Sequence, residues 1–265
     1  HLDYYRSIEN LKKSFLEFAQ NTKDKVIGWG DQPYVAELIS KAGGISFGWD
    51  KENLLRGVNF KFDRGFSYFD LYIKGKAMAS IKIPLIGEYN CLNTMAALAF
   101  FYYLGEDLEK VKQALLDFKG TGRRLEAKGK IKGVTFIDDY AHHPAEIRAV
   151  LSAARLLNPK RLFVIFQPHR FSRVSLLKEE FRRCFSGADH LVISDIYSAC
   201  EENTFGVSAQ ELAEQVSENI SGDVEYIPKG ELVTAISRRL AEGDLVLGLG
   251  AGDINRIMEE IRKCL

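Results

Sequence analysis

The sequence predicts an α/β protein whose second half is a Rossmann-like, doubly wound, mostly parallel sheet. Beyond residue 122, near-continuous apolar segments alternate with helical patterns, which is typical of strands buried on both faces. Between residues 45 and 85 the pattern is instead that of an antiparallel stretch. Glycines at positions 120 and 122 separate the two patterns, so we expect two domains, residues 1–122 and 123–265.

The first half begins with helical patterns and continues with strands. Apolar residues at positions 8, 11, 15 and 18 predict an amphipathic helix over 7–20. A strand at 26–29 follows, and Pro33 then opens a helix to Lys41, because proline favours the first helical turn. Alternating and periodic patterns predict the rest of this half: strands 58–62, 66–73 and 78–85, then helices 90–104 and 108–118.

The second half alternates strictly between strand and helix patterns. Its predicted strands are Val134–Asp138, Leu162–Phe166, Leu191–Ser194, Val224–Ile227 and Leu245–Leu249. In parallel α/β sheets, ligands bind outside the carboxyl ends of the strands. The residues that directly follow these strands are therefore the candidates for a functional site.

The composition is ordinary for a globular protein and excludes several classes. The 265 residues are 46% hydrophobic and 27% charged, and 36 basic residues balance 36 acidic ones. Without a basic excess or stripe, nucleic acid is not an expected partner. No apolar run is long enough to insert into a membrane, and the four separated cysteines form no CxxC pair. We expect a reduced, cytoplasmic protein, and the start HLDYY without Met predicts a mature, truncated or excised segment.

The first strand of the second half leads directly into Asp138-Asp139-Tyr140-Ala141-His142-His143-Pro144. Pro144 starts the next helix, and a helix N-terminus favours anions. Unprotonated imidazoles at this place can bind substrate or metal, and a carboxylate can hold a ribose. The alternative interpretation is a helix cap without further function.

Three other strand ends carry candidate residues. Arg170 and Arg173 open a helix three residues apart, which suits a carboxylate or phosphate, although a solvated helix start is the alternative. Acids from Asp195 to Glu201 can receive an amino group or form an ordinary acidic loop. Glycines in Gly250-Ala251-Gly252 let backbone amides approach a ligand, but the full GxGxxG pattern is absent.

In the first half, Gly87-Glu88-Tyr89-Asn90 opens an apolar helix, and Asn90 is predicted as its N-cap. Asn93 lies three residues further on, so the two amides can converge on a base or a phosphate. The sequence contains no GxxxxGK[ST] loop, so it supplies no complete triphosphate cradle.

Five motifs, in this order, resemble the Mur ligase family across the whole chain: GEYNCLN, GTGRRLE, DDYAHHPAEI, FQPHRFSR and GAGDI. HLDYY resembles a DHxD-type segment of the family's central ATPase domain. The family has three domains that bind, in order, a UDP moiety, ATP and the incoming amino acid. The resemblance implies that residues 1–122 are the C-terminal half of the ATP-binding domain and 123–265 the amino-acid-binding domain. The UDP-binding domain and the P-loop would then be missing N-terminal parts of the same enzyme, and the segment alone would be inactive.

The activity that the resemblance implies is an ATP-dependent ligation that forms a C–N bond. L-alanine would be joined to the carboxylate of UDP-N-acetylmuramate through an acyl phosphate, in peptidoglycan precursor synthesis. ATP and Mg²⁺ are the implied cofactors, because phosphoryl transfer needs the phosphate charge neutralised.

The resemblance also implies residue roles. His1 would help to ligate Mg²⁺. Asn90 and Asn93 would contact the adenine end of ATP, Arg124 its phosphates and Asp139 its ribose. The substrate side would be formed by Tyr140, His142, His143, Arg170, Arg173 and Glu201, and the catalytic candidates are His142 and Arg124. The spacing at which sister ligases carry a carbamylated lysine falls on Phe15, so no carbamylation is predicted.

Three alternatives stay open. A family member that recycles murein tripeptide is similar around the DDY and HHP residues. A metal-dependent hydrolase could use Asp138, Asp139, His142 and His143. A nucleotide- or sugar-binding module without catalysis is the third.

Overall fold

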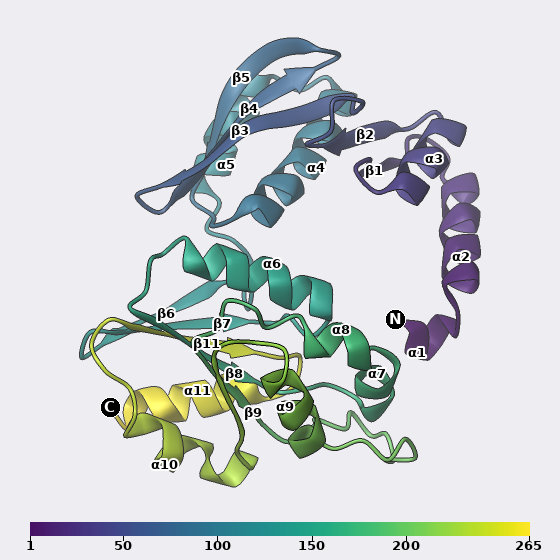
Figure 1. The fold of residues 1–265 in the computed structure, drawn as a ribbon. Coiled ribbons are helices and arrows are strands. Elements are labelled where there is room, and N and C mark those ends of the chain that lie inside the picture. The colour runs from purple at the N-terminus through teal and green to yellow at the C-terminus, as the bar shows by residue number, and fades with distance from the viewer. The chain divides into compact units, whose positions relative to one another are not determined.

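Two separate sheets organise the computed structural model, which describes residues 1–265, except for the side chains of Leu2 and Asp3. The chain divides into two units, Leu2–Lys119 and Gly120–Leu265, and His1 groups with the second unit. Each unit has its own sheet (Figure 1). Each also has its own cluster of buried apolar residues.

The first unit is a mixed sheet with helices. Its sheet has the order β1-β2-β3-β4-β5, in which β1, β2 and β3 run parallel and β3, β4 and β5 antiparallel. Its strands are β1 (Ile27–Trp29), β2 (Ile45–Gly48), β3 (Leu55–Asp63), β4 (Phe66–Ile73) and β5 (Lys76–Ile83). Its helices are α1 (Leu2–Tyr5), α2 (Ile8–Asn21), α3 (Pro33–Lys41), α4 (Glu88–Leu104) and α5 (Leu108–Asp117).

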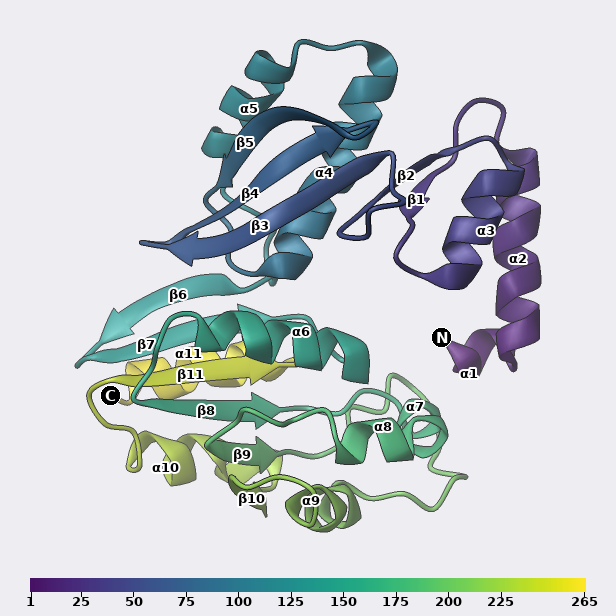
Figure 2. The same cartoon turned by 45° about the horizontal axis from the view of Figure 1, so that its top comes forward.

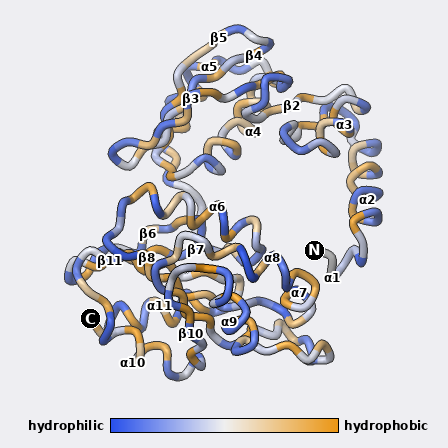
Figure 3. The backbone as a smooth tube through the Cα atoms, in the orientation of Figure 1, coloured by the Kyte–Doolittle hydropathy of each residue, from blue (hydrophilic) through white to orange (hydrophobic). Residues whose placement is uncertain are grey.

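The core of this unit lies between the sheet and α4. Leu55, Phe69 and Ile81 come from three neighbouring strands and share one buried cluster with Met95 and Leu98 of α4. The amphipathic pattern predicted for α2 is confirmed, and Figure 3 shows hydrophilic and hydrophobic residues alternating along its turns. The prediction of an antiparallel stretch from residue 45 onward is wrong at its start, because β2 pairs parallel with both neighbours.

The second unit is a doubly wound sheet of order β10-β9-β8-β11-β7-β6, parallel except for the edge strand β6. Its strands are β6 (Glu126–Ile131), β7 (Val134–Asp139), β8 (Arg161–Phe166), β9 (His190–Ile193), β10 (Asp223–Tyr226) and β11 (Asp244–Leu249). Its helices are α6 (Pro144–Arg155), α7 (Phe171–Leu176), α8 (Lys178–Arg182), α9 (Ala209–Ser217), the 3₁₀ turn η1 (Lys229–Glu231), α10 (Leu232–Ser237) and α11 (Ile254–Lys263).

Helices cover both faces of this sheet. On one face, Phe136, Phe163 and Val246 pack against Ile236 of α10 and Ile257 of α11. In Figure 2, α6 and α11 lie on opposite faces of the strands. This arrangement confirms the predicted fold class, a mostly parallel, Rossmann-like sheet preceded by a mixed α/β part. No helix that the structure describes is long and apolar enough to cross a bilayer.

Candidate active site

The carboxyl ends of four parallel strands lie level at one edge of the second sheet. The register pairs Asp139 of β7 with Leu249 of β11, Leu249 with Phe166 of β8, and Phe166 with Ile193 of β9. Figure 2 shows β8, β9 and β11 ending on the same side. The segments that follow these strands therefore meet at one edge, where ligands bind in this architecture.

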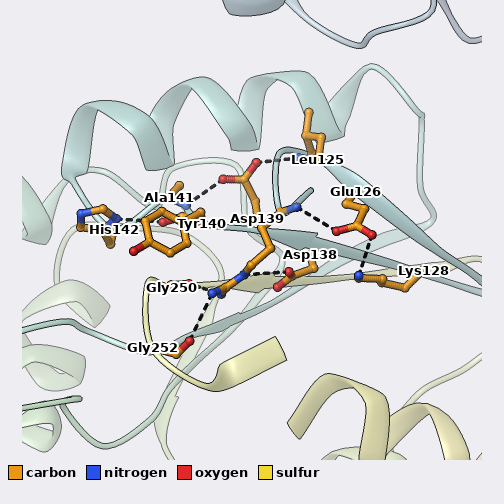
Figure 4. Close-up of polar contacts among 11 residues, drawn as sticks. Leu125, Glu126, Lys128, Asp138, Asp139, Tyr140, Ala141, His142, Gly250 and Gly252 are labelled. Atoms are coloured by element: carbon orange, nitrogen blue, oxygen red, sulfur yellow. Dashed lines mark hydrogen bonds and ion pairs between the residues drawn. The ribbon is translucent and has the colours of Figure 1, made fainter. Parts of the chain in front are cut away.

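Asp139 ends β7 and is fully buried. Its Oδ2 accepts the backbone N–H of Leu125 at 2.7 Å, and its Oδ1 accepts that of Ala141 at 2.7 Å (Figure 4). Burial raises the pKa of the Asp139 carboxyl to about 6, although the two backbone donors act in the opposite direction. In this geometry the carboxylate binds two segments of its own chain together, and a contact with the ATP ribose stays a prediction.

His142 has a defined tautomer. Its Nδ1 lies 2.8 Å from the carbonyl oxygen of Tyr140. Since a carbonyl only accepts, Nδ1 carries the proton and Nε2 keeps the lone pair. Burial lowers the pKa of His142, so the ring is neutral at pH 7. The Glu146 carboxylate accepts the backbone N–H groups of His142 and His143 at 3.0 and 3.1 Å, so the predicted helix-cap role of this segment is also present.

His169 joins this group from the segment after β8. Its ring stacks on Tyr197 with centroids 5.5 Å apart and lies 5.7 Å from the ring of His142. Arg173 donates to Nδ1 of His169 at 3.0 Å and to its carbonyl at 3.2 Å. A neutral His169 therefore carries its proton on Nε2, the opposite tautomer to that of His142.

We expect His169 to titrate near pH 4. Burial and the positive charge of Arg173 lower its pKa to about 4, whereas an unfolded histidine titrates near 6.5. The neutral ring therefore contributes stability that is present above the unfolded pKa and is lost as the pH falls through about 4. NMR titration of the ring checks the midpoint, and His169→Gln is expected to flatten the acid limb of unfolding. A midpoint near 6.5 would contradict this prediction.

Arg170 and Arg173 both lie at the start of α7, as predicted. Arg170 is the N-cap, with φ at 70°, and its guanidinium lies 3.3 Å from Oε1 of Glu201. Glu201 also accepts from the hydroxyl and backbone N–H of Ser172, at 2.7 and 3.1 Å. These bonds outweigh burial and hold the pKa of Glu201 below its usual value. Glu201 therefore orients the arginine-bearing helix start, and both of its oxygens have partners within the chain.

Arg123, which no sequence pattern distinguishes from its neighbours, lies at the centre of the polar contacts between β7 and the loop after β11. It bonds to Asp138, Gly250 and Gly252. Its neighbour Arg124 is instead half-exposed, 4.0 Å from Glu146. Sequence pattern could not separate the two adjacent arginines, because only the fold distinguishes their surroundings.

Asn90 is not the N-cap of α4, which corrects the prediction. Gly87 is the N-cap, and Asn90 lies in the first turn, where its amide donates to the carbonyl of Ile86 at 2.9 Å. Gly87 has φ at 97°, a conformation that glycine adopts without strain, so the helix begins earlier than the Asn pattern predicts. The amides of Asn90 and Asn93 do approach each other, at 3.5 Å.

His1, the predicted metal ligand, belongs to no group of three potential metal ligands among the described residues. His1 is exposed, and its ring lies 4.8 Å from that of His143. Among the described side chains, no group of three His, Cys, Asp or Glu residues could hold a metal ion. The site proposed for a metal hydrolase is also divided, because Asp138 faces Arg123 and Asp139 faces backbone amides.

Buried acids, imidazoles and two arginines thus follow the strands of a doubly wound α/β sheet at the carboxyl ends, the place where proteins of this architecture bind ligands. Residues 1–101 match the Mur ligase middle domain, and residues 123–252 match the family described as Mur ligase, glutamate ligase domain. The chain therefore belongs to the Mur ligase family.

Curated relatives and solved structures agree with this family. The chain is 38% identical to a UDP-N-acetylmuramate–L-alanine ligase of Caldanaerobacter subterraneus, covering 98% of this chain and 58% of the relative. It is 40% identical to the enzyme of the same name from Desulfotalea psychrophila, covering 100% and 59%. The crystal structure of UDP-N-acetylmuramate-alanine ligase from Thermotoga maritima superposes with a TM-score of 0.80 at 27% identity, covering 99% of this chain and 56% of that one. The chain thus spans less than two thirds of the length of these relatives.

Proposed function

We propose that the protein containing this chain joins L-alanine to the carboxylate of UDP-N-acetylmuramate in an ATP-dependent reaction, as a step of peptidoglycan precursor synthesis. The observation that carries the proposal is the likeness, over 98% and 100% of this chain, to relatives that bear this enzyme name, at 38% and 40% identity. A cytoplasmic location is part of the proposal. We also propose that the segment alone is inactive, since its sequence contains no phosphate-binding P-loop.

The proposed reaction has two steps. The muramate carboxylate attacks the γ-phosphorus of ATP, which gives an acyl phosphate and ADP. The amine of L-alanine then attacks the acyl carbon, and a tetrahedral intermediate releases phosphate and leaves an amide. Residues 1–122 would contribute to the ATP-binding domain and residues 123–265 would bind the amino acid.

The second unit offers groups that suit the second step. Arg170 and Arg173 are cations at one helix start, and guanidinium groups match the carboxylate of an amino acid. Tyr140, His143 and Glu201 would complete the substrate side. The amine must lose a proton before it can attack, and the unprotonated Nε2 of His142 is suited to receive it.

The family resemblance assigns nucleotide contacts to residues of each unit separately. Asn90 and Asn93 would contact the adenine, Asp139 the ribose and Arg124 the phosphates. Mg²⁺ would neutralise phosphate charge in the family reaction. The described side chains offer no set of three ligands for it, His1 included, so we assign no step of the mechanism to a metal held by this chain.

The experiment is a phosphate-release assay on the full-length protein, with ATP, UDP-N-acetylmuramate and one amino acid at a time. Release that needs both substrates and is strongest with L-alanine is the expected result. Release with free murein tripeptide instead would assign the recycling activity. No release in any combination from folded protein would overturn the proposal.

We expect Arg170→Ala to raise the KM for L-alanine about tenfold to a hundredfold, the loss of one charged hydrogen bond. Its guanidinium is partly exposed beside Glu201, so a substrate carboxylate can share it. Steady-state kinetics in the full-length protein measure the effect, and Arg182→Ala on α8 is a matched control outside the site. Unchanged alanine kinetics would remove Arg170 from the amino-acid site.

A further inference from the structure

Arg123 is fixed on several sides by groups of the second unit. Its Nε donates to Oδ2 of Asp138 at 3.1 Å. Its Nη2 donates to the carbonyl of Gly250 at 2.5 Å, and its Nη1 to that of Gly252 at 3.3 Å. Figure 4 shows Asp138, Gly250 and Gly252 converging from the end of β7 and the loop after β11. One guanidinium therefore ties the segment that begins this unit to two strand ends.

Water cannot take the place of Arg123 as the partner of Asp138, because this acid is buried. The Asp138 side chain is 1% exposed, whereas that of Arg123 is 23% exposed. A buried carboxylate is costly unless a cation and hydrogen bonds compensate it. Arg123 supplies the cation and one hydrogen bond, to Oδ2, whereas Oδ1 has no hydrogen-bond partner and burial still raises the pKa of Asp138. The buried acid therefore depends on residue 123 staying in this place.

The backbone on both sides of Arg124 is strained and is held by hydrogen bonds. Arg123 has φ at 57° and Leu125 has φ at 42°, values that side-chain-bearing residues rarely adopt. The N–H of Arg123 donates to Glu126 at 2.8 Å, and its carbonyl accepts from the N–H of Tyr140 at 2.8 Å. The N–H of Leu125 donates to Asp139.

Arg124, between these two strained residues, has a more exposed side chain than Arg123. Its side chain is 45% exposed, and its guanidinium lies 5.9 Å from the ring of Tyr140. Packing of the Arg124 side chain does not require this backbone conformation, which the hydrogen bonds of residues 123 and 125 and the burial of Leu125 maintain.

We propose that Arg123 and Asp138 form a positioning pair, which holds residues 123–125 in this conformation and thereby orients Arg124 for phosphoryl transfer. This inference rests on the proposed function, from which the role of Arg124 comes. Arg123 is a positioning residue in it and contacts no reacting atom.

The test combines variants in the full-length ligase. Arg123→Lys keeps the charge but cannot form the three bonds, and we expect kcat to fall about tenfold or more. In a protein that already carries Arg124→Ala, the same change is expected to alter kcat less than about threefold, because the oriented group is gone. Equal losses in both backgrounds would show that Arg123 acts independently of Arg124 and would overturn the proposal.

Arg161, the first residue of β8, provides a matched control at the amino ends of the strands, away from the candidate site. It pairs with the buried Asp244 at 2.6 Å and donates to the carbonyl of Arg239 at 2.7 Å. Arg161→Lys therefore removes a similar set of bonds from a similar buried acid. We expect a comparable loss of thermal stability but an unchanged kcat, and an equal loss of kcat would mean that general destabilisation explains both variants.

Amide hydrogen exchange tests the pair without the ligase reaction. The N–H groups of Tyr140 and Leu125 are expected to exchange about tenfold faster or more in Arg123→Lys and in Asp138→Asn than in wild type. The N–H of Leu162, beside the control pair, is expected to stay unchanged. If the wild-type protein shows no ligase activity, the proposed function fails. The exchange measurement still decides whether the Arg123–Asp138 positioning pair holds residues 123–125 in place. Unchanged exchange at Tyr140 and Leu125 would overturn the proposal.

Discussion

Arg124→Ala is expected to lower kcat of the full-length protein about 10²–10³-fold, as expected when one preorganised group that stabilises transition-state charge is removed. Negative charge builds up on the oxygens of the transferring phosphoryl group in the transition state. The half-exposed guanidinium of Arg124 is accessible to donate hydrogen bonds to those oxygens. The effect should appear mainly in kcat, because the interaction strengthens in the transition state.

The stability of this variant should hardly change. Arg124 is partly exposed and its ion pair with Glu146 measures 4.0 Å, so we expect a change within about 0.5 kcal/mol. Arg124→Lys keeps the positive charge but loses the planar guanidinium, so its kcat should lie between the kcat values of wild type and Arg124→Ala. Arg148, exposed on α6, provides the control Arg148→Ala. An Arg124→Ala protein with normal kcat would exclude the phosphate role.

The interior strands of the second unit could be predicted from the sequence because both of their faces are buried. β8 and β11 read as uninterrupted apolar runs, and the structure places them within one residue of the predicted ranges. The edge strand β6 was missed, because Glu126–Ile131 alternates charged and small residues at a partly solvated edge. β2 was missed because its four residues include two glycine or serine positions and offer no clear period.

The candidate site was predictable in its place but not in its contacts. Parallel strands end at one edge, so the sequence predicted that the polar residues after β7 and β8 lie close together, and the structure places them so. One partner of Asp139, Ala141, is local, but Arg123 and Leu125 lie 15 and 14 residues before the acids that they contact. Arg123 in turn bonds to Gly250, 127 residues further along the chain. No local pattern contains such contacts, which depend on the closed fold.

Asp139→Ala is expected to lower the free energy of unfolding by about 2–4 kcal/mol, since two hydrogen bonds to a buried acceptor are lost. The N–H groups of Leu125 and Ala141 would be left without their acceptor in a buried place. Chemical denaturation measures this loss. Asp189→Ala is a control for the loss of a carboxylate–backbone bond away from the site, because the partly exposed Asp189 accepts the backbone N–H of Leu162 at 2.6 Å near the amino end of β8.

The same variant is expected to raise the KM for ATP about tenfold to a hundredfold, because the proposed ribose contact is lost. The control Asp189→Ala should lose stability without this change in KM. A variant with normal ATP kinetics but impaired alanine kinetics would place Asp139 on the amino-acid side instead.

Nucleotide analogues separate a direct ribose contact from an effect through Leu125. A wild-type enzyme that holds the ribose hydroxyls should prefer ATP over its 2′- and 3′-deoxy forms, and Asp139→Ala should lose that preference. If Asp139 acts only by fixing residues 123–125, the variant keeps the preference and loses kcat, as Arg123→Lys does. The full burial of Asp139 favours the second outcome, and the family resemblance favours the first. The ratio of kcat/KM values for ATP and the deoxy analogues, compared between wild type and variant, therefore decides which of the two roles the buried carboxylate performs.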